Sequence, residues 1–211
     1  MTVLNVQKST KIAAALLIAV ATSACTTQST SHATSRAITL GGASAGAAMV
    51  APDFRVTKVN VTVPETLTVS EANTIKPRAD IVWREDPYGD RYARYEQVKA
   101  VMEAGLNSGA AALKGQRAIV LDVEMVRFHA QTERVRYSSL PSRHEIEFLL
   151  TVRDAQTGDV IVPSHLVNAT FDAFGGDAAV AADRAGITQK QRIGEHLAGV
   201  ILSELSKPIA L

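Results

Sequence analysis

The chain has 211 residues, of which 46% are hydrophobic, 20% charged and 5% aromatic, with a formal net charge of +1. Two of its 22 basic side chains, Lys8 and Lys11, lie in a predicted leader, which leaves 20 against 21 acidic side chains. This balance argues against a nucleic-acid binder, which would show a clustered positive excess. The single cysteine, Cys25, excludes a disulfide-built fold, which needs an even number of cysteines.

The first predicted element is an N-terminal export signal. Residues 1–11 contain two lysines and no acidic residue, and residues 12–21 form an unbroken apolar run. This run is too short for a transmembrane helix, which needs about 20 residues. A charged start, a short apolar run and small residues before a cut are typical of a secretory signal. We therefore predict a lipoprotein signal peptide over residues 1–24.

The residues around the predicted cut resemble the bacterial lipobox. Thr22, Ser23 and Ala24 precede Cys25, although Leu or Val is usual where Thr22 stands. The resemblance implies that the Cys25 thiol receives diacylglycerol and that further acylation, as with palmitate, follows. One acyl chain binds a membrane only marginally, at about 0.8 kcal/mol per buried methylene, whereas two or three chains hold durably. Thr26, rather than Asp, favours the outer membrane. The alternative is an ordinary signal peptide with an incidental cysteine.

Residues 25–53 are predicted to form a flexible tether. The stretch 26–46 is rich in Ser, Thr, Ala and Gly and lacks hydrophobic periodicity. Such a stretch buries too little apolar area to offset its ordering entropy. Ser44 lies in a G-x-S-x-G pattern here, but a nucleophile elbow requires a preceding strand. We therefore expect no catalytic role for Ser44.

The predicted folded domain spans residues 54–211 and begins with a strand at 54–64. Valines alternate with polar residues from Val59 to Val63, which is typical of a half-buried strand. Phe54 and Val56 have the opposite phase, so we expect either a bulge before Val59 or a later start of the strand. Further short strands are predicted at residues 66–70 and 79–83.

A helical period follows from about residue 90 to residue 113. Val98, Met102 and Leu106 fall on one face of this helix. Gly105 and Gly109 weaken a helix, and we expect them to allow its close approach to a sheet.

The second half of the domain alternates strongly, and then becomes helical. Strands are predicted at residues 118–128, 144–153, 160–162 and 165–174, with a turn at 154–159. A short helix is expected at 177–185. Thr188 and Gln191 have the spacing of a capping box that begins a last helix before Pro208. This order predicts an α+β two-layer sandwich, an antiparallel sheet with two main helices packed on one face.

The titratable residues do not form a recognisable catalytic or metal motif. His129 and His144 bracket one loop and could approach each other, but a metal needs three or four converging ligands. The acidic residues of the two central strands could lie together, and the neighbouring Arg127 and Arg153 make cross-strand ion pairing the simplest interpretation; these acids are Asp122, Glu124, Glu145 and Glu147. We therefore predict no metal, no cofactor and no enzymatic activity.

Two segments are candidate interaction surfaces. One is the loop 129–143 with the arginine that precedes it, because Arg and Tyr are favoured at interface hot spots; the candidate residues are Arg127, Arg134, Arg136, Tyr137 and Arg143. The alternative is a solvated basic loop. The other segment, 83–92, contains the sole tryptophan, Trp83, and is interpreted either as a structured loop against the sheet edge or as a contact surface.

Several motifs together resemble an uncharacterised family of alphaproteobacterial lipoproteins, a domain of unknown function. They are ADIVWREDPYGDRYA, VLDVEMVRFHAQTERVRY, LTVRDAQTGDVI, FGG and TQKQRIGEHLAGVI, within residues 54–205. The resemblance implies location and fold but no activity and no site residues.

The sequence thus predicts an envelope lipoprotein, anchored through Cys25 and facing the periplasm from the outer membrane. Its expected role is that of a non-enzymatic accessory protein with an envelope protein as partner. The alternative is a module that binds a lipid or another amphiphile for an envelope transport system. A filled core would favour the first role and an apolar cavity between helix and sheet the second.

Overall fold

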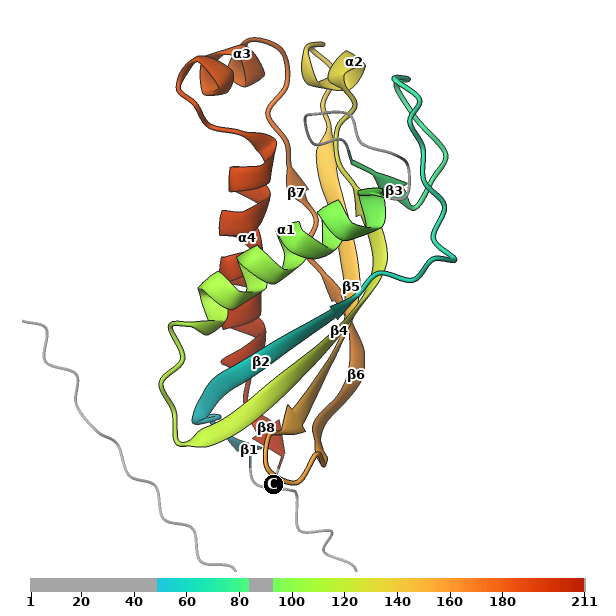
Figure 1. The fold of residues 1–211 in the computed structure, drawn as a ribbon. Coiled ribbons are helices and arrows are strands. Elements are labelled where there is room, and N and C mark those ends of the chain that lie inside the picture. Colours follow the sequence, from blue (N-terminus) through green and yellow to red (C-terminus); the bar gives the residue numbers. More distant parts are fainter. Residues whose placement is uncertain (1–48, 84–92, 211) are drawn as a thin grey trace, which may run out of the picture. The chain divides into compact units, whose positions relative to one another are not determined.

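Two long antiparallel strands, β4 (Arg117–His129) and β5 (Arg143–Asp154), form the centre of the fold. The computed structural model describes residues 49–83 and 93–210 (Figure 1). Alternate residues of both strands are buried, as their period of two predicts, and Leu121 of β4 lies opposite Val152 of β5. This hairpin is the scaffold on which the other elements assemble.

Shorter strands extend the sheet on both sides of this hairpin. β2 (Phe54–Thr62) and β3 (Ile81–Val82) both pair with β4, while β6 (Val160–Asn168) and β7 (Phe171–Asp172) both pair with β5. The predicted α+β class is confirmed, and the sheet is mostly antiparallel.

The pairing of β2 with β4 differs from the antiparallel arrangement that the sequence predicted. The two strands are parallel, with Phe54 opposite Arg117 and Thr62 opposite Glu124. The reason is topological, because a helix lies between them in the chain and parallel neighbours need such a crossover. The predicted bulge is confirmed by a register shift between Val56 and Lys58.

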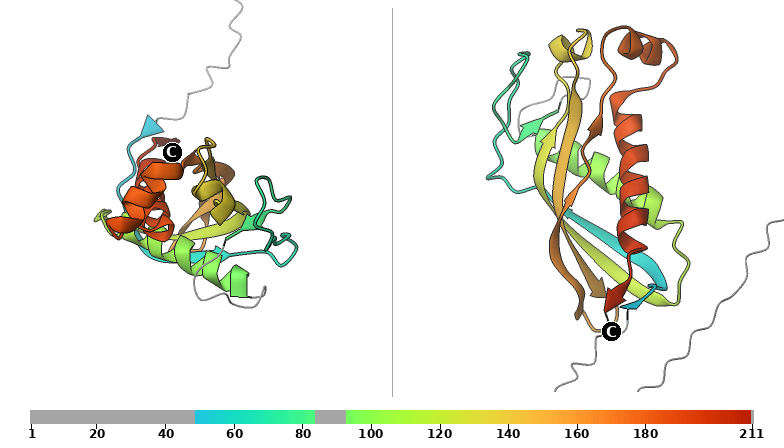
Figure 2. Two further views of the ribbon diagram at one scale, coloured as in Figure 1. Left: turned by 90° about the horizontal axis from the view of Figure 1, so that it is seen from above. Right: turned by 180° about the vertical axis from the view of Figure 1, so that it is seen from behind.

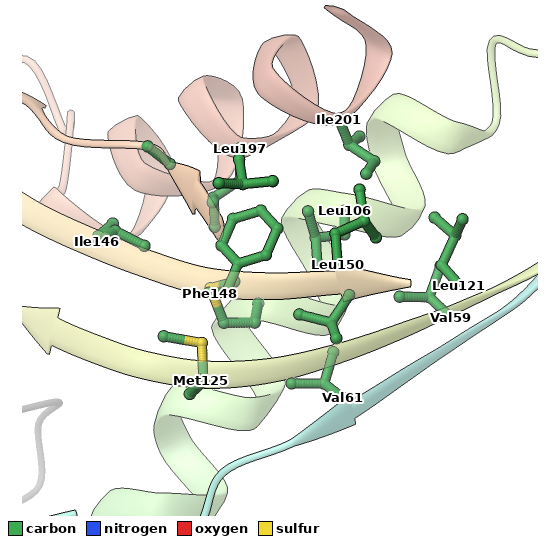
Figure 3. Close-up of a cluster of buried hydrophobic side chains, with 14 of the residues drawn as sticks. Val59, Val61, Leu106, Leu121, Met125, Ile146, Phe148, Leu150, Leu197 and Ile201 are labelled. Atoms are coloured by element: carbon green, nitrogen blue, oxygen red, sulfur yellow. The ribbon is translucent and has the colours of Figure 1, made fainter. Parts of the chain in front are cut away.

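Two helices, α1 (Ala93–Ala110) and α4 (Gln189–Leu205), pack against the buried face of the sheet. Phe148 of β5 points towards Leu197 of α4, and Leu106 of α1 lies beside them (Figure 3). All three side chains are fully buried. Each such side chain contributes about 1.5–3 kcal/mol on leaving water, so this layer supplies much of the folding free energy.

The glycines of α1 allow a close crossing of two helices rather than the expected approach to a sheet. A Cβ atom at Gly105 would lie 2.9 Å from Cβ of Leu197, and one at Gly109 would lie 2.7 Å from Cα of Ala198. Both neighbours belong to α4. The prediction of a close approach at Gly105 and Gly109 was therefore right, but the element that they approach is α4 and not the sheet.

The last helix begins as the sequence predicts. Oγ1 of Thr188 accepts a hydrogen bond of 3.1 Å from the Gln191 backbone N–H. The Gln191 side chain donates to Glu195 instead of turning back to Thr188, so only half of the capping box forms. The expected short helix before it is confirmed as α3 (Gly176–Arg184).

The two ends of the described chain meet in a small sheet of their own. β1 (Met49–Val50) pairs antiparallel with β8 (Ile209–Ala210), although residues 49–50 fall within the range predicted as tether. This pair lies at one end of the folded unit. The short helix α2 (Glu133–Arg136), α3 and β3 lie at the other end (Figures 1 and 2).

Candidate functional site

The end of the fold that carries α2 contains the cavities and most of the candidate interaction residues. Thr132 caps α2 by accepting a hydrogen bond from the Val135 backbone N–H, at 3.3 Å. The same hydroxyl donates to the Thr74 carbonyl, and the Asn73 side chain accepts from the Arg134 backbone N–H. These bonds join α2 to segment 70–77, although 58 residues or more separate the bonded pairs in sequence.

Arg136 and Tyr137 share one carboxylate. Arg136 donates to Oδ1 of Asp183 at 2.5 Å, and the Tyr137 hydroxyl donates to Oδ2 at 3.0 Å. The hydrogen bond from Arg136, followed by that from Tyr137, holds the pKa of Asp183 below its usual value. Arg136 is only 5% exposed, so it belongs to the interior of this end and not to an exposed surface.

The two candidate arginines that lie on strands, Arg127 of β4 and Arg143 of β5, also have acidic partners. Nε of Arg127 lies 2.8 Å from Oε2 of Glu145, and Nε of Arg143 lies 3.2 Å from Oδ1 of Asp172. The second pair is well exposed to solvent, which limits its contribution to stability. Arg134 has an exposed side chain on α2. The structure thus brings the five predicted interaction residues to one end of the domain.

The expected cross-strand ion pairing on the outer face of the sheet is confirmed. Arg153 bonds to Asp122 at 2.8 Å, as Arg127 does to Glu145. A hydrogen bond from Asn60, and then one from Arg153, lowers the pKa of Asp122. Both carboxylates thus pair with a neighbouring arginine across the strands.

A groove of about 470 Å³ lies between segment 75–77 and the start of β5. Its apolar wall includes Ile75 and Leu140, which are 47% and 44% exposed. Four charged residues also line the groove, three of them basic: Lys76, Arg127, Arg143 and Glu145. His129 also lines the groove, and burial lowers the pKa of its imidazole, which is therefore uncharged at neutral pH.

A second, smaller cavity of about 200 Å³ is also lined in part by α2, through Glu133 and Arg136. Gln131 and Thr132 line both the groove and this cavity. Its wall is mainly polar, and Trp83 forms part of its base, in edge-to-face contact with Phe128 at 5.6 Å between ring centroids. Of the candidate contact segment 83–92, Trp83 is described and is buried, whereas residues 84–92 lie outside the described residues.

The two histidines that were expected to approach each other lie in different surroundings. His129 interacts with the Pro77 carbonyl, at 3.2 Å from Nε2. His144 is fully buried, neither ring nitrogen has a hydrogen-bond partner, and its ring lies 4.9 Å from that of Phe171. Burial, assisted by the charge of Arg192, lowers its pKa to about 3. Phe171 stacks in turn on His196.

The sequence did not point to Asp183 or Ile75, which the fold adds to this end. Asp183 is in a helix far along the chain from Arg136, and only the turn of the chain after β7 brings them together. Across residues 49–83 and 93–210 no three His, Cys, Asp or Glu side chains are grouped closely enough to hold a metal ion. Cys25 and Ser44 lie outside the described residues. No helix in the described part is long and apolar enough to cross a membrane.

Solved structures show only a distant likeness to this fold. A Xanthomonas campestris protein of the DUF330 family has 10% identity and a TM-score of 0.38, over 72% of this chain and 81% of its own. A minor lipoprotein from Acinetobacter baumannii has 13% identity and a TM-score of 0.32, over 71% and 91%. A dodecameric PelC variant from Paraburkholderia phytofirmans has 14% identity and a TM-score of 0.31, over 75% and 94%.

A search of curated proteins found no match to the chain. A family model does match, over residues 54–211, and its description is a family of unknown function, DUF6778. The expected resemblance to a family without an assigned activity is confirmed at this level. Because the match covers well over half of the 211 residues, the chain belongs to the DUF6778 family.

Proposed function

We propose that this protein is a lipid-anchored envelope lipoprotein whose domain is a non-enzymatic accessory module. In this proposal, acyl chains on Cys25 hold it on the periplasmic face of the outer membrane. The groove at the α2 end then binds another envelope protein. The supporting observation is the groove itself, where Ile75 and Leu140 are exposed beside Lys76 and Arg143.

The composition of the groove indicates which partner segment would fit. Exposed apolar side chains that line a concave surface favour an apolar segment of a protein. Three basic side chains and one carboxylate line the groove, namely Lys76, Arg127, Arg143 and Glu145. Because Arg127 pairs with Glu145 and Arg143 with Asp172, these five residues together carry one excess positive charge. An apolar segment flanked by acidic residues would therefore match both the shape and the charge of the groove.

The direction in which the chain enters the domain also supports this proposal. The described chain begins at β1, at the end opposite α2 (Figures 1 and 2). The groove therefore lies at the end of the domain opposite the strand at which the described chain begins (Figure 1).

The second candidate, an amphiphile held between helix and sheet, has less support. The space between α1, α4 and the sheet is filled by fully buried side chains that include Met102, Leu106, Phe148 and Leu197. An acyl chain would have to displace this packing, at a cost of several kcal/mol. An apolar ligand would therefore have to bind elsewhere.

Photocrosslinking in intact cells tests the proposal. A photoreactive amino acid at Leu140 should crosslink to one envelope protein, and the same residue at Ile75 should capture that protein too. Leu166, which is 56% exposed on β6 and outside the groove, is the control position. Arg143→Glu should reduce both groove crosslinks. Equal capture from Leu166, or capture of lipid alone from Leu140, would contradict the proposal.

A further inference from the structure

One histidine of β5, His144, belongs to a column of rings that joins three elements of the fold. Its side chain is fully buried, and its ring centroid lies 4.9 Å from that of Phe171 in β7. Phe171 stacks at 4.1 Å on His196 of α4, and the guanidinium of Arg192, in the first turn of α4, lies 5.4 Å from the same ring of Phe171. The column therefore holds β7 and the start of α4 against β5.

The groups around His144 disfavour a positive charge on its ring. Arg192 and His196 act on it from α4 and Arg136 acts on it from α2, and all three are basic. Burial, and then the charges of Arg192, Arg136 and His196, lower the pKa of His144 to about 3. A proton on this ring would therefore create a cation that has lost its hydration and faces other cations.

The carboxylates of the elements around His144 are engaged with other residues. Asp183 of α3 pairs with Arg136, Asp172 of β7 with Arg143, Glu145 of β5 with Arg127, and Glu195 of α4 accepts a hydrogen bond from Gln191. Protonation of His144 is therefore opposed as long as β7 and the first turn of α4 stay in place.

The segment that covers His144 is weakly packed. β7 consists of two residues, and α3 buries two alanines, Ala179 and Ala182. Phe174 and Ile187, on the two sides of α3, are each 37% exposed. Segments with few buried apolar side chains open locally at a low free energy. An opening of residues 171–192 would remove Phe171 and Arg192 from beside His144 and let water reach its ring.

We propose that residues 171–192, which comprise β7, α3 and the first turn of α4, form a flap that detaches locally from β5 in mild acid as His144 takes up a proton. At neutral pH the ring is uncharged whether the flap is closed or open, so the proton does not favour opening. Below about pH 6.5 the uncovered ring binds a proton that the covered ring refuses, and opening becomes roughly tenfold more favourable for each further pH unit.

Detachment of the flap would change the wall of the groove. Asp172 in the flap pairs with Arg143 at 3.2 Å, and the Ala173 N–H donates to the Ser142 carbonyl at 3.0 Å. Ser142 and Arg143 both line the groove. The open flap would therefore release two neighbouring lining residues from the contacts that hold them. The flap itself does not depend on the accessory role proposed above.

Hydrogen exchange followed by mass spectrometry tests the flap. The full-length protein, purified from membranes in detergent, is exchanged at pH 7, 6 and 5, and the urea-unfolded protein at each pH supplies the reference rates. We expect the protection of amides in residues 176–192 to fall at least tenfold between pH 7 and pH 5. At pH 5 these amides should still exchange faster than those of β4, because the opening is local. Unchanged protection, or equal protection of the flap and β4 at pH 5, overturns the proposal.

Variants identify the histidine that is responsible. His144→Leu should lessen the acid-induced loss of protection at least fivefold, and His144→Phe, which keeps an aromatic ring beside Phe171, should do the same. His165→Leu is the matched control, because His165 of β6 lies outside the column, 3.5 Å from Glu204. This control should lose protection in acid as the wild type does. A full loss in either folded His144 variant, or its abolition in His165→Leu, overturns the assignment to His144.

Discussion

Arg136 donates a hydrogen bond of 2.5 Å to Asp183, a residue 47 positions further along the chain, and so fastens α2 to α3. The side chain of Arg136 is 6% exposed and that of Asp183 is 38% exposed, so the cation is the more buried partner. A buried guanidinium that loses its carboxylate keeps its desolvation cost without compensation.

We therefore predict that Asp183→Ala lowers the free energy of unfolding by about 1–2 kcal/mol. The double variant Arg136→Met/Asp183→Ala should recover part of this loss, because no unpaired charge remains. Urea denaturation measures both. Asp172→Ala removes the carboxylate from the exposed pair with Arg143 and should change stability by less than about 0.5 kcal/mol. A double variant that is no more stable than the single one would contradict this interpretation.

The buried imidazole of His144 predicts acid sensitivity. Its folded-state pKa is about 3, below the ordinary value of 6.5, because burial disfavours the charged form. Between these two values the unfolded chain binds a proton that the folded chain does not. This group therefore contributes full stability above pH 6.5, and the contribution falls by about 1.4 kcal/mol per pH unit as the pH drops towards 3.

His144→Leu should remove that part of the pH dependence. Since neither ring nitrogen has a hydrogen-bond partner, the variant should be at least as stable as the wild type at pH 7. Urea denaturation at pH 7, 6, 5 and 4 follows the difference between the two proteins. Parallel loss of stability in both on acidification would show that another group is responsible.

The crossing of α1 and α4 predicts opposite effects for two glycine substitutions. Gly109→Ala places a Cβ atom 2.7 Å from Cα of Ala198, and should cost about 1–3 kcal/mol because backbone cannot move aside easily. Gly199→Ala, within α4, meets nothing within 4 Å and should gain up to about 1 kcal/mol of helix propensity. Thermal melts of the two variants should shift in opposite directions; a shift in the same direction would refute the role of the close crossing.

The proposed anchor predicts a change of cellular location. Cys25→Ser removes the thiol that would carry the acyl chains. This variant should therefore incorporate no labelled palmitate, and it should no longer be found in the outer-membrane fraction. Cell fractionation and fluorography measure the two effects. If the wild-type protein itself carries no acyl label on residue 25, the lipoprotein proposal is wrong.

The sequence predicts the individual strands and helices well, because apolar residues recur with a period of about two in a half-buried strand and 3.6 in a half-buried helix. The predicted strands 118–128 and 144–153 do bury one face each, with Leu121 and Phe148 on it, and the predicted last helix buries Leu197. The parallel pairing of β2 was missed, because alternation gives a strand its faces but not its neighbour. The close contact at Gly109 was assigned to the wrong partner for the same reason.

The candidate site was less predictable than the fold. The basic residues of segment 129–143 were visible as a cluster, but α2 was not, since a helix of one turn has no period to detect. The cation Arg136 was expected on a surface and is buried, because Asp183 supplies its counter-charge from a distant helix. The groove depends on Ile75, which carries no motif and reaches the site only through the fold.

The pairing of β1 with β8 determines where a C-terminal fusion would lie on the domain. Since Val50 lies opposite Ile209, the final residues of the described chain are fixed next to its start. A fluorescent protein or affinity tag fused to the C-terminal end would therefore lie at the β1–β8 end of the domain, opposite the end that carries α2 (Figure 1). The fusion would not cover the groove that Leu140 lines, so the tagged protein should still bind the partner of the groove.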